Sequence, residues 1–565
     1  LSRLKTLQSV VLRSFEALSG TAAVAPRASE AVVAGAATVH EPTIVVPRLL
    51  HSYAAAPALA GQLTFPSDAV VLITDDGRGV AEALERQISS RGGKAVIIKN
   101  GPQLKNGAWS FDIADYRSVQ ENVAAIRKEH GSIAGLVHLV ALGARTPFSS
   151  TSLPEWKGRL GVEVKGLFNL AKALKEDLIA SGARGFGWLF AATAIEYLDG
   201  AAGMTVGQDG ICGFLKSASQ EWPELACRAL NLEMSNPPEL LAGQIISEMA
   251  IRQPHVEIGY QSGERVAYSA KVVAVDRANN SLKIEKDWVI VITGGARGIT
   301  AEIAHELADR YSPTLLLIGR SPMPEEEPSW TKGLVSKVEM KSAIAAKLKE
   351  SGSEFSIADI ESRCSSIAAG REIRENIAKI RSAGSEVRYI QGDVRDEAGF
   401  GAIIDSIYSQ YGRIDGFVHG AGVIEDKLIE DKTPESFDRV FDTKADSSFI
   451  LSGKLKSAQL KFLVFFTSVA GFFGNRGQAD YAAANEVVNG LARHLDKAWP
   501  GRVVAINWGP WDKTGMVTPE IKKQFADRGI QLVPPDAGRR MFMDELERGR
   551  KGEVEVVVGG GPWAT

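Results

Sequence analysis

A tyrosine and an asparagine four positions apart, Tyr481 and Asn485, occur in the Ala-rich stretch GNRGQADYAAANEVV. Residues at this spacing share one face of a helix, and a positioned tyrosine can protonate the carbonyl oxygen of a ketone as it is reduced. Reductases with a tyrosine acid usually place a lysine at the second position. The stretch therefore predicts a reductase whose catalytic cation comes from another part of the chain.

Two further side chains can complete this chemistry. Tyrosine has an unperturbed pKa of about 10, and a nearby ammonium lowers it by favouring the phenolate. Lys444, in the helical segment RVFDTKADSSFIL, is the candidate ammonium, and Ser468, after the apolar strand FLVFF, can donate a hydrogen bond to the substrate carbonyl. Taken singly, Tyr481 fits a buried core position better and Lys444 a surface position, whereas the whole set favours a catalytic site.

A glycine-rich turn between a strand and a helix predicts a phosphate-binding loop. In VIVITGGARGIT an apolar strand runs into the turn and then into a helical pattern, so backbone N–H groups and the positive end of the helix dipole can face a pyrophosphate. Glycine is needed where the backbone turns tightly and approaches a ligand. Such a cluster alone is also compatible with a plain tight turn. The expected loop residues are Thr293, Gly294, Gly295, Arg297 and Gly298.

Residues after the next strands fit the rest of a dinucleotide. Arg320 and Ser321 follow the second strand, where an acidic residue would bind the ribose of NAD; a cation and a hydroxyl suit the 2′-phosphate of NADP instead. A lone solvated arginine at a strand end is about as common. Asp393, after the third strand, can accept from the adenine amino group, and His419 fits a packed strand residue without a catalytic role. Small residues after the fourth strand let the cofactor lie against the backbone: Gly420, Ala421 and Gly422.

Two diverged copies of one fold account for the order of these motifs. The pattern of strand, glycine-containing turn, helix and strand occurs in AVVLITDDGRGVAEALERQISSRGGKAVIIK and again in WVIVITGGARGITAEIAHELADRYSPTLLLIG, and GSIAGLVHLVAL likewise matches GRIDGFVHGAGV. Each copy predicts an open parallel sheet with helices on both faces and a ligand at the carboxyl ends of the strands. The expected fold class is α/β, with two tandem Rossmann-like, doubly wound parallel sheets.

The repeat also predicts how the chain is divided. We expect an amphipathic helix and an Ala/Pro-rich linker at 1–45, a structural copy at 46–275 and a catalytic copy at 276–565, with the boundary after the hairpin pattern VEIGYQSGERVAYS. The connection after TLLLIG is longer than a crossover helix needs. Its helical patterning predicts an insertion at about 322–370, and a packing or interdomain role is the plainest interpretation.

The first copy lacks the loop that the second copy has. Asp75 and Asp76 replace Gly294 and Gly295. Two carboxylates then lie where a pyrophosphate would bind, and like charges repel each other. The first copy is therefore expected to be structural, with one active site per chain.

The first copy also lacks the catalytic tyrosine. No tyrosine falls at the position of Tyr481, because alignment on Gly-Gln gives Ile211 and alignment on Trp-Pro gives Met204. We expect Thr193 at the place of the catalytic serine and Lys165 at the place of the catalytic lysine. A lysine alone does no reduction, so this part of the chain is expected to give structural support.

Composition excludes several other kinds of partner. The chain has 565 residues, a formal net charge of −3 and 45% hydrophobic residues, which gives no electrostatic reason to expect nucleic acid or an anionic membrane. No apolar run reaches the roughly 18 residues of a membrane span. The cysteines Cys212, Cys227 and Cys364 have no metal-ligand spacing, so we expect no metal and a reduced, cytoplasmic location. The two ends suggest a piece of a longer polypeptide.

The motifs TGGARGI, HGAGV, TSVAG, GQADYAAAN and NWGPW resemble, in the same order, those of the short-chain dehydrogenase/reductase superfamily. More narrowly, they resemble the ketoreductase didomain of modular and iterative polyketide synthases, over nearly all of Pro47 to Trp563. In that family the first copy is structural, and lysine and asparagine are exchanged relative to other short-chain reductases. The resemblance implies a catalytic tetrad of Lys444, Ser468, Tyr481 and Asn485. It also completes the expected cofactor contacts with Ile299, Val394, Gly509 and Pro510, together with Lys444 and Tyr481.

Departures from the family pattern indicate a distinct branch. Thr300 replaces the usual glycine after the loop, and Arg297 stands where many members have glycine. The helical insertion and the ending of the chain resemble ketoreductases of polyunsaturated fatty acid synthases and related iterative synthases. The segment Ile424–Glu425–Asp426 stands at the place of the Leu-Asp-Asp of the subtype that forms a 3R alcohol. Phe473 replaces the tryptophan of the opposite subtype, so a 3R product is expected.

The resemblance implies an NADPH-dependent reductase of the 3-oxo group of an acyl chain on an acyl carrier protein, working with other domains of the same synthase. Tyr481 would protonate the carbonyl oxygen, Ser468 would orient it, Lys444 would lower the tyrosine pKa, and Asn485 would hold a proton-relay water. One alternative is a noncatalytic structural module of a synthase, which the intact tetrad disfavours. The other is a free-standing dehydrogenase of small alcohols, which the two-copy architecture disfavours.

Overall fold

The computed structural model describes residues 46–57, 61, 63–102, 108–144, 146–195, 205–251, 255–323, 326–352, 354–512 and 519–562. These residues belong to one compact unit. The helix and linker predicted at 1–45 lie outside the described residues. Within the described part of the chain, no helix combines the length and the apolar character that crossing a membrane requires.

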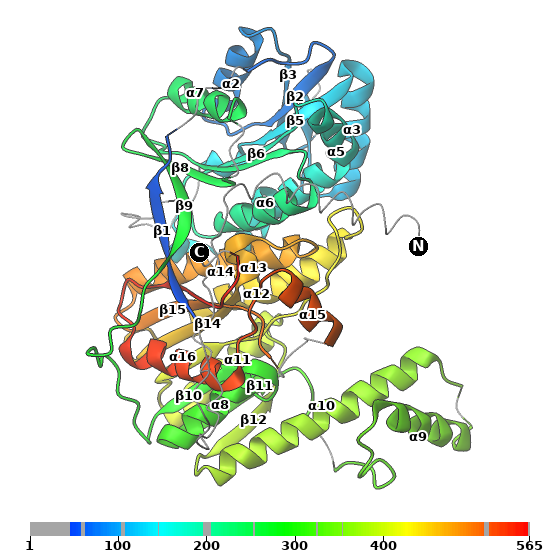
Figure 1. Ribbon diagram of the computed structural model, residues 1–565, viewed down its shortest axis with the longest axis vertical. Coiled ribbons are helices and arrows are strands. Elements are labelled where there is room, and N and C mark those ends of the chain that lie inside the picture. Colours follow the sequence, from blue (N-terminus) through cyan, green and yellow to red (C-terminus); the bar gives the residue numbers. More distant parts are fainter. Residues whose placement is uncertain are drawn as a thin grey trace, which may run out of the picture. The chain divides into compact units, whose positions relative to one another are not determined.

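Two parallel sheets with the same strand order form the framework of this unit (Figure 1). The order is β4-β3-β2-β5-β6-β7-β8 in the first copy and β12-β11-β10-β13-β14-β15-β16 in the second. This order, which reverses beside the first strand of each copy, is that of a Rossmann sheet, and it confirms the predicted fold class. The strands of the first copy are β2 (Ala69–Thr74), β3 (Ala95–Asn100), β4 (Trp109–Phe111), β5 (Ser132–His138), β6 (Trp188–Thr193), β7 (Ala226–Asn231) and β8 (Glu257–Gln261). Those of the second are β10 (Val289–Thr293), β11 (Thr314–Gly319), β12 (Val387–Gln391), β13 (Gly416–His419), β14 (Phe462–Ser468), β15 (Arg502–Trp508) and β16 (Glu555–Val558).

Two antiparallel strands, β1 (Arg48–Ala55) and β9 (Glu264–Val272), join the two sheets into one. β9 pairs with β8 in the predicted hairpin, and β1 pairs with both β9 and β16. Arg48 at the start of β1 forms a buried ion pair with Glu545 of the second copy, at 2.7 Å. A strand from the start of the first copy therefore borders the second sheet, and the boundary near 275 stays a prediction.

Alternating strand residues fill a core on each face of the sheets. In β2, Val70 and Leu72 belong to one core and Val71 and Ile73 to another, as expected for a parallel sheet covered by helices on both sides. The helices of the first copy are α2 (Val80–Ser89), α3 (Tyr116–His130), α4 (Leu153–Leu160), α5 (Gly166–Ala183), α6 (Asp209–Glu221) and α7 (Pro238–Met249), with short helical turns η1 (Val140–Leu142), η2 (Phe148–Ser150) and η3 (Gly161–Lys165). Those of the second are α8 (Gly298–Tyr311), α9 (Lys337–Glu350), α10 (Ile357–Ser382), α11 (Glu397–Tyr411), α12 (Pro434–Lys454), α13 (Val469–Phe473), α14 (Ala479–Ala498), α15 (Pro519–Asp527) and α16 (Pro535–Arg548).

Helix α6 of the first copy packs directly on α14, the helix that carries Tyr481. Glycine makes this close approach possible, because a Cβ at Gly213 would lie only 2.4 Å from the carbonyl oxygen of Ala482. A buried ion pair also crosses the contact, with Lys216 Nζ 3.3 Å from a carboxylate oxygen of Glu486. The first copy therefore supports the backbone on which the catalytic tyrosine is expected.

Replacing Gly213 by alanine is expected to lower both stability and turnover. The added methyl would push against the backbone beside Tyr481, and a displacement of about 1 Å can cost roughly 100-fold in rate. Gly243→Ala on α7 is the matched control, since its nearest neighbours are the end of the Gln87 side chain at 3.9 Å. Thermal unfolding and the rate of the ketone reduction expected from the sequence would be measured for both variants. A Gly213→Ala protein with the wild-type melting temperature and rate would contradict this support role.

Two helices, α9 and α10, lie in the long connection between β11 and β12 (Figure 1), where the sequence predicts a helical insertion at 322–370. Helix α10 continues unbroken to Ser382, beyond the expected end of the insertion. Its later turns place Ile373 and Ile377 in the core of the second sheet. One helix therefore serves as both the end of the insertion and the crossover to β12.

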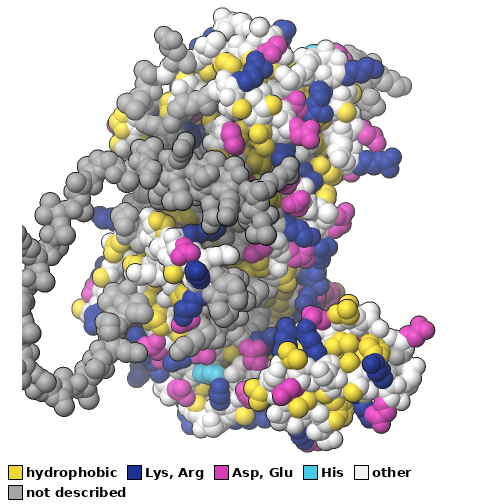
Figure 2. Space-filling view, turned by 45° about the vertical axis from the view of Figure 1, so that its right-hand side comes forward, with side chains coloured by type: hydrophobic (Ala, Val, Ile, Leu, Met, Phe, Trp, Pro, Cys, Tyr) yellow, Lys and Arg dark blue, Asp and Glu magenta, His cyan; other side chains and the backbone are white. Residues whose placement is uncertain are grey.

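The insertion has a small core of its own and an apolar surface. Met340, Ile344 and Cys364 are buried between α9 and α10. Large apolar side chains gather on the outside of this region (Figure 2), where Val335 is 92% exposed and Ile357 is 80% exposed.

Candidate active site

The four predicted catalytic residues come from three neighbouring elements of the second copy. Ser468 ends β14, Lys444 lies on α12, and Tyr481 and Asn485 lie on α14, which packs against α12. Lys444 is 4% exposed, and its Nζ donates to the carbonyl oxygen of Phe466 at 2.7 Å, two residues before Ser468. The carboxyl end of β14 therefore brings the lysine and the serine to the same edge of the sheet.

The surroundings of Tyr481 act on its acidity in opposite directions. Burial raises the pKa of the phenol above its ordinary value, hydrogen bonds with Asn485 and Ser468 lower it, and the carboxylate of Asp426 raises it. Burial alone lowers the pKa of Lys444 to about 8. The lysine ammonium is turned toward the Phe466 carbonyl, so the expected lowering of the tyrosine pKa by Lys444 stays a prediction.

Asn485 is held by the helix it belongs to. Its Nδ2 donates to the carbonyl oxygen of Tyr481 at 2.6 Å. Its Oδ1 is buried and accepts no hydrogen bond from the described residues. A buried amide oxygen of this kind needs a donor, and a water molecule could supply it. This geometry suits the proton-relay role expected for Asn485.

The loop after β10 has the backbone that a phosphate site needs. Gly294 and Gly298 adopt positive φ angles of 71° and 57°, which favour glycine. Thr300, at the place of the usual family glycine, donates its hydroxyl hydrogen to carbonyl oxygens of this loop, at 2.9 Å for Arg297. A Cβ at residue 420 would lie only 2.2 Å from the methyl group of Thr300, so glycine is needed at that position. The departure at Thr300 is thus accommodated by Gly420, the residue that directly follows β13.

Thr293 and His419 hold strands β10 and β13 together below this loop. The Thr293 hydroxyl accepts hydrogen bonds from the backbone N–H groups of Gly420 and Ala421, at 3.1 and 3.2 Å. His419 lies between Thr293 and the hydroxyl of Ser447, and burial, with a smaller effect of the nearby lysine, lowers its pKa to about 3. A fixed neutral imidazole fits the packed strand residue predicted for His419.

A cavity of about 240 Å³ opens between the loop and the ends of β11, β12 and β13. Eight of the predicted cofactor residues line it: Gly294, Arg297, Arg320, Ser321, Asp393, Val394, Ala421 and Gly422. The other predicted cofactor residues are not on its wall: Thr293, Gly295, Gly298, Ile299, Gly420, Lys444, Tyr481, Gly509 and Pro510. Gly509 and Pro510 directly follow β15, which pairs with β14 through Trp508 and Ser468, so they lie at the same edge of the sheet as the tetrad.

Sequence reasoning missed three residues at this cavity. Arg395 binds Asp393 at 2.6 Å, and this hydrogen bond lowers the pKa of the Asp393 carboxyl, with a smaller contribution from Arg320. Glu372 of α10 accepts hydrogen bonds from the loop, and the neighbouring Ile373 lines the cavity. Arg395 stands two positions after Asp393 in DVRD and could have been noticed. Glu372 has no such signal, because only the fold brings α10 to the loop.

The segment expected to influence stereochemistry is held by one ion pair and by hydrogen bonds. Glu425 binds Arg439 at 2.7 Å, and hydrogen bonds from Arg439 and Ser436 lower its pKa to about 2. Asp426 accepts a hydrogen bond from Gln478, the residue that precedes α14, at 2.9 Å. The segment is thereby tied to the start of the helix that carries Tyr481.

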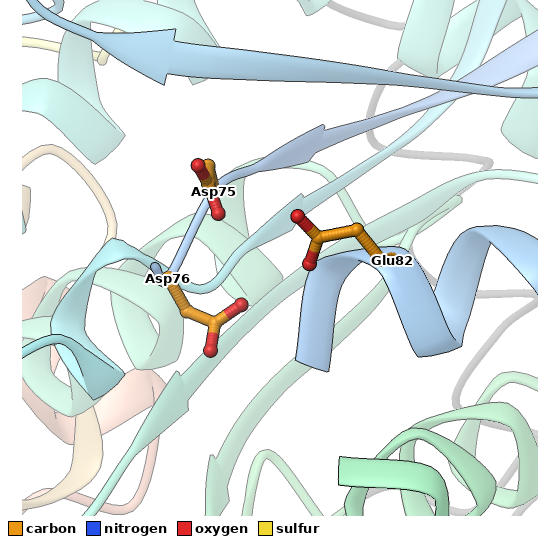
Figure 3. Close-up of side chains that lie close together, drawn as sticks. All are labelled: Asp75, Asp76 and Glu82. Carbon is orange, nitrogen blue, oxygen red and sulfur yellow. The ribbon is translucent and has the colours of Figure 1, made fainter. Parts of the chain in front are cut away.

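In the first copy a side chain occupies the anion site. The Asp76 carboxylate accepts hydrogen bonds from the backbone N–H groups of Arg78, Val80 and Ala81 at the start of α2. Asp75 and Glu82 place two more carboxylates beside it (Figure 3). The backbone N–H groups that donate to Asp76 are the ones that would face a pyrophosphate. The first copy therefore fills its own phosphate site with a carboxylate, in addition to repelling a negatively charged ligand.

Strand register corrects one predicted equivalence between the copies. Thr193 pairs with Asn231 in the way that Thr467 pairs with Asn507. Thr193 therefore corresponds to Thr467, and Ala194 takes the place of the catalytic serine; the expectation for Thr193 was wrong. The sequences ATA in the first copy and TSV in the second can be aligned in two ways that differ by one residue, and only the pairing of each strand with its neighbour decides between them.

The equivalents of the other catalytic residues have structural roles. Gln208 and Gln478 precede α6 and α14 in the same way, so Ile211 takes the place of Tyr481, and Met204 lies outside the described residues. Lys165 forms ion pairs at 2.7 Å with two aspartates of α12. Lys165, which stands in the first copy at the position of the catalytic lysine, therefore helps to bind the first copy to the second.

A doubly wound sheet with a glycine loop after its first strand, a serine at the end of β14, and tyrosine, asparagine and lysine on the two helices α14 and α12 is typical of a reductase of the short-chain type. Residues 289–513 match the family model of the KR domain. Residues 79–229 match the model of a second family, "Enoyl-(Acyl carrier protein) reductase", in agreement with a duplicated fold.

Relatives and solved structures narrow this class. The chain is 32% identical, over 84% of its length, to a polyunsaturated fatty acid synthase polypeptide of Thraustochytrium, and it spans 17% of that polypeptide. It is 26% identical to polyketide synthase PksN of Bacillus subtilis over 57% of its length, or 5% of that protein. The crystal structure of an N-terminal ketoreductase from the macrolactin assembly line has a TM-score of 0.68 and 20% identity over 91% of this chain and 92% of that one, which shows the shared fold. These findings identify a ketoreductase of the polyketide synthase type, within the short-chain dehydrogenase/reductase superfamily.

Proposed function

We propose that this chain reduces the 3-oxo group of an acyl chain carried on an acyl carrier protein, with NADPH as the reductant and a 3R alcohol as the product. It would act as the ketoreductase part of a polyketide or polyunsaturated fatty acid synthase. The observation that carries the proposal is the arrangement of Ser468 at the end of β14 with Tyr481, Asn485 and Lys444 on the helices α14 and α12, which pack against each other. Lys444 also adjoins the cavity, because a Cβ at the wall residue Gly422 would lie 3.0 Å from its side chain. The name and coverage of the relative from Thraustochytrium favour a polyunsaturated fatty acid synthase.

The residues around the cavity support a phosphorylated dinucleotide as the proposed cofactor. Gly294 keeps the loop free of side chains where a phosphate would approach, and the N–H of Gly298 at the start of α8 can donate to an anionic group. Arg320 and Arg395 add two guanidinium groups on the wall, which suits the 2′-phosphate that distinguishes NADPH from NADH. Asp393 stays ionised and can accept from an adenine amino group. When bound, the nicotinamide supplies hydride to the substrate carbon.

The protein's own residues would handle the proton. The raised pKa of Tyr481 keeps its hydroxyl protonated at neutral pH, so that it can donate to the carbonyl oxygen. The Ser468 hydroxyl would donate a second hydrogen bond to the same oxygen and stabilise the charge that develops there. The buried Oδ1 of Asn485 would hold a water that returns a proton to the tyrosine. Lys444 would supply a cation near the end of β14, where its Nζ donates to the carbonyl oxygen of Phe466.

Replacing Arg320 by alanine tests the proposed cofactor. Removing a charge-assisted hydrogen bond to the 2′-phosphate should raise the KM for NADPH by roughly 10- to 100-fold and leave the KM for NADH nearly unchanged. The assay uses 3-oxoacyl carriers of graded chain length with each nucleotide, and the chirality of the product is determined. A wild-type preference for NADH, or equal losses with both nucleotides, would reject the role of Arg320. A 3S product would reject the stereochemical part of the proposal.

A further inference from the structure

A carboxylate from another helix occupies the start of α8. The N–H of Gly298 donates to Glu372 Oε1 at 2.9 Å, and Arg297 Nε donates to Glu372 Oε2 at 2.7 Å. Glu372 lies on α10, 75 residues further along the chain than Arg297. The first N–H of a helix and a loop arginine are also the donors that a dinucleotide phosphate would use. Glu372 and such a phosphate therefore need the same groups.

The backbone of α10 is held against the loop near Glu372, whereas the side chain of Glu372 is partly exposed and has room to rotate. Asn376, one helical turn after Glu372, is buried and donates to the carbonyl oxygen of Ala296 in the loop at 3.0 Å. The side chains of Arg297 and Glu372 are 51% and 38% exposed. Both side chains can rotate into solvent without any shift of the helix. The ion pair can thus be opened by a ligand.

The two copies differ in how an internal carboxylate meets the helix N-terminus. In the first copy, Asp76 belongs to the loop itself, is 4% exposed and accepts three backbone N–H groups. In the second copy, Glu372 reaches one backbone N–H from a separate helix and is part of an exposed ion pair. An exposed pair is worth much less than a buried, threefold-bonded carboxylate. Asp76 is therefore held more strongly at its helix than Glu372 is, and Glu372 is the easier of the two carboxylates to displace.

We propose that Glu372 sets the affinity for the cofactor by competing with its phosphates for the start of α8 and for Arg297. Binding of the dinucleotide displaces the Glu372 side chain, and the freed guanidinium of Arg297 then faces the phosphates. This inference rests on the proposed use of NADPH. It also gives the insertion a link to the site, because its helix α10 carries the competing residue.

The test is the dissociation constant of NADPH, measured by the change in nucleotide fluorescence for wild type, Glu372→Gln and Glu375→Gln. Glu375 lies on the same helix and is exposed. Among the described residues, the hydrogen bonds from the loop go to Glu372 and not to Glu375, so the replacement of Glu375 changes the net charge equally without touching the proposed contact. Glu372→Gln is expected to bind NADPH roughly 3- to 10-fold more tightly. Glu375→Gln should stay within about twofold of wild type.

Thermal unfolding without nucleotide gives a second readout. Glu372→Gln should melt at or slightly below the wild-type temperature and gain more from added NADPH. A purely structural role for Glu372 would loosen the loop and weaken binding, which is the opposite sign. An unchanged or larger dissociation constant in Glu372→Gln would overturn the inference alone, whereas binding by neither protein would overturn both the inference and the proposed cofactor.

Discussion

Replacing Tyr481 by phenylalanine is expected to lower the rate of 3-oxoacyl reduction by about 10²- to 10⁴-fold, because the substrate oxygen loses its proton donor. The ring stays in place, so the packing of α14 and the cofactor cavity should be preserved. The dissociation constant of NADPH should therefore stay within about twofold of wild type. The measurement is the initial rate of NADPH oxidation with a 3-oxoacyl carrier, combined with a fluorescence titration of the nucleotide.

Tyr408→Phe is a matched control for this variant. Tyr408 is 7% exposed, and its hydroxyl accepts a hydrogen bond from the backbone N–H of Lys456 at 2.9 Å, away from the cavity. Loss of this hydroxyl should cost about 1 kcal/mol of stability and leave turnover intact. If Tyr481→Phe turned over like wild type, or if both variants lost activity equally, Tyr481 could not be the acid.

Replacing Lys432 by methionine is expected to reduce the free energy of unfolding by about 3–5 kcal/mol at neutral pH. Lys432 and Asp480 form a fully buried ion pair at 2.7 Å, with side chains 0% and 1% exposed. The lysine also donates to the backbone carbonyl of Glu425. Asp480 directly precedes Tyr481 and accepts its backbone N–H. Without the lysine, a carboxylate is left unpaired in the core at the start of α14.

The pH dependence of the stability of Lys432→Met tests whether the unpaired carboxylate of Asp480 causes the loss. Burial raises the pKa of Asp480 to about 6 even with Lys432 present, so the folded protein holds the proton more tightly than the unfolded chain does. Without Lys432 the folded pKa of Asp480 rises further, so the loss caused by Lys432→Met should be largest at pH values above 6 and should shrink as the pH falls through about 6, where Asp480 becomes protonated in both folded proteins. Chemical denaturation at several pH values measures it.

The double variant Lys432→Met with Asp480→Asn serves as the control. It removes the charge as well as its partner, and it should recover most of the stability at neutral pH. A Lys432→Met protein as stable as wild type, or a loss that grows as the pH falls, would contradict the assigned role of this pair.

The local motifs were predictable because they depend on short stretches of chain. A strand, a glycine turn and a helix follow one another within TGGARGIT, so the loop and the positive φ of Gly294 and Gly298 follow from the sequence. Tyr481 and Asn485 share one helix, and Ser468 ends an unmistakable apolar strand. Lys444 was a candidate from its helical segment and its place in the order of motifs, and the family resemblance then assigned it to the tetrad. In the structure its Nζ donates to the carbonyl oxygen of Phe466, two residues before Ser468.

The features that the sequence did not predict all depend on distant contacts. Strand β1 pairs with β16, about 500 residues away in the chain, and nothing in its own residues names that partner. Glu372 reaches the loop only because α10 is a single helix that runs from the insertion onto the sheet. The buried Lys432–Asp480 pair looks like two surface charges in the sequence, since charged residues are seldom buried. The shift at Thr193 shows that register between diverged copies needs the strand pairing itself.

We propose that the chain reduces a carrier-bound 3-oxoacyl group at a single site in its second copy. Intact mass spectrometry of a 3-oxoacyl carrier protein, incubated with the protein and NADPH, measures this reduction on the carrier itself. We predict a gain of two hydrogens on the carrier with wild type and none with Tyr481→Phe, while both proteins bind NADPH. A carrier left unchanged by a wild-type protein that binds NADPH, or one reduced equally by Tyr481→Phe, would contradict the claim.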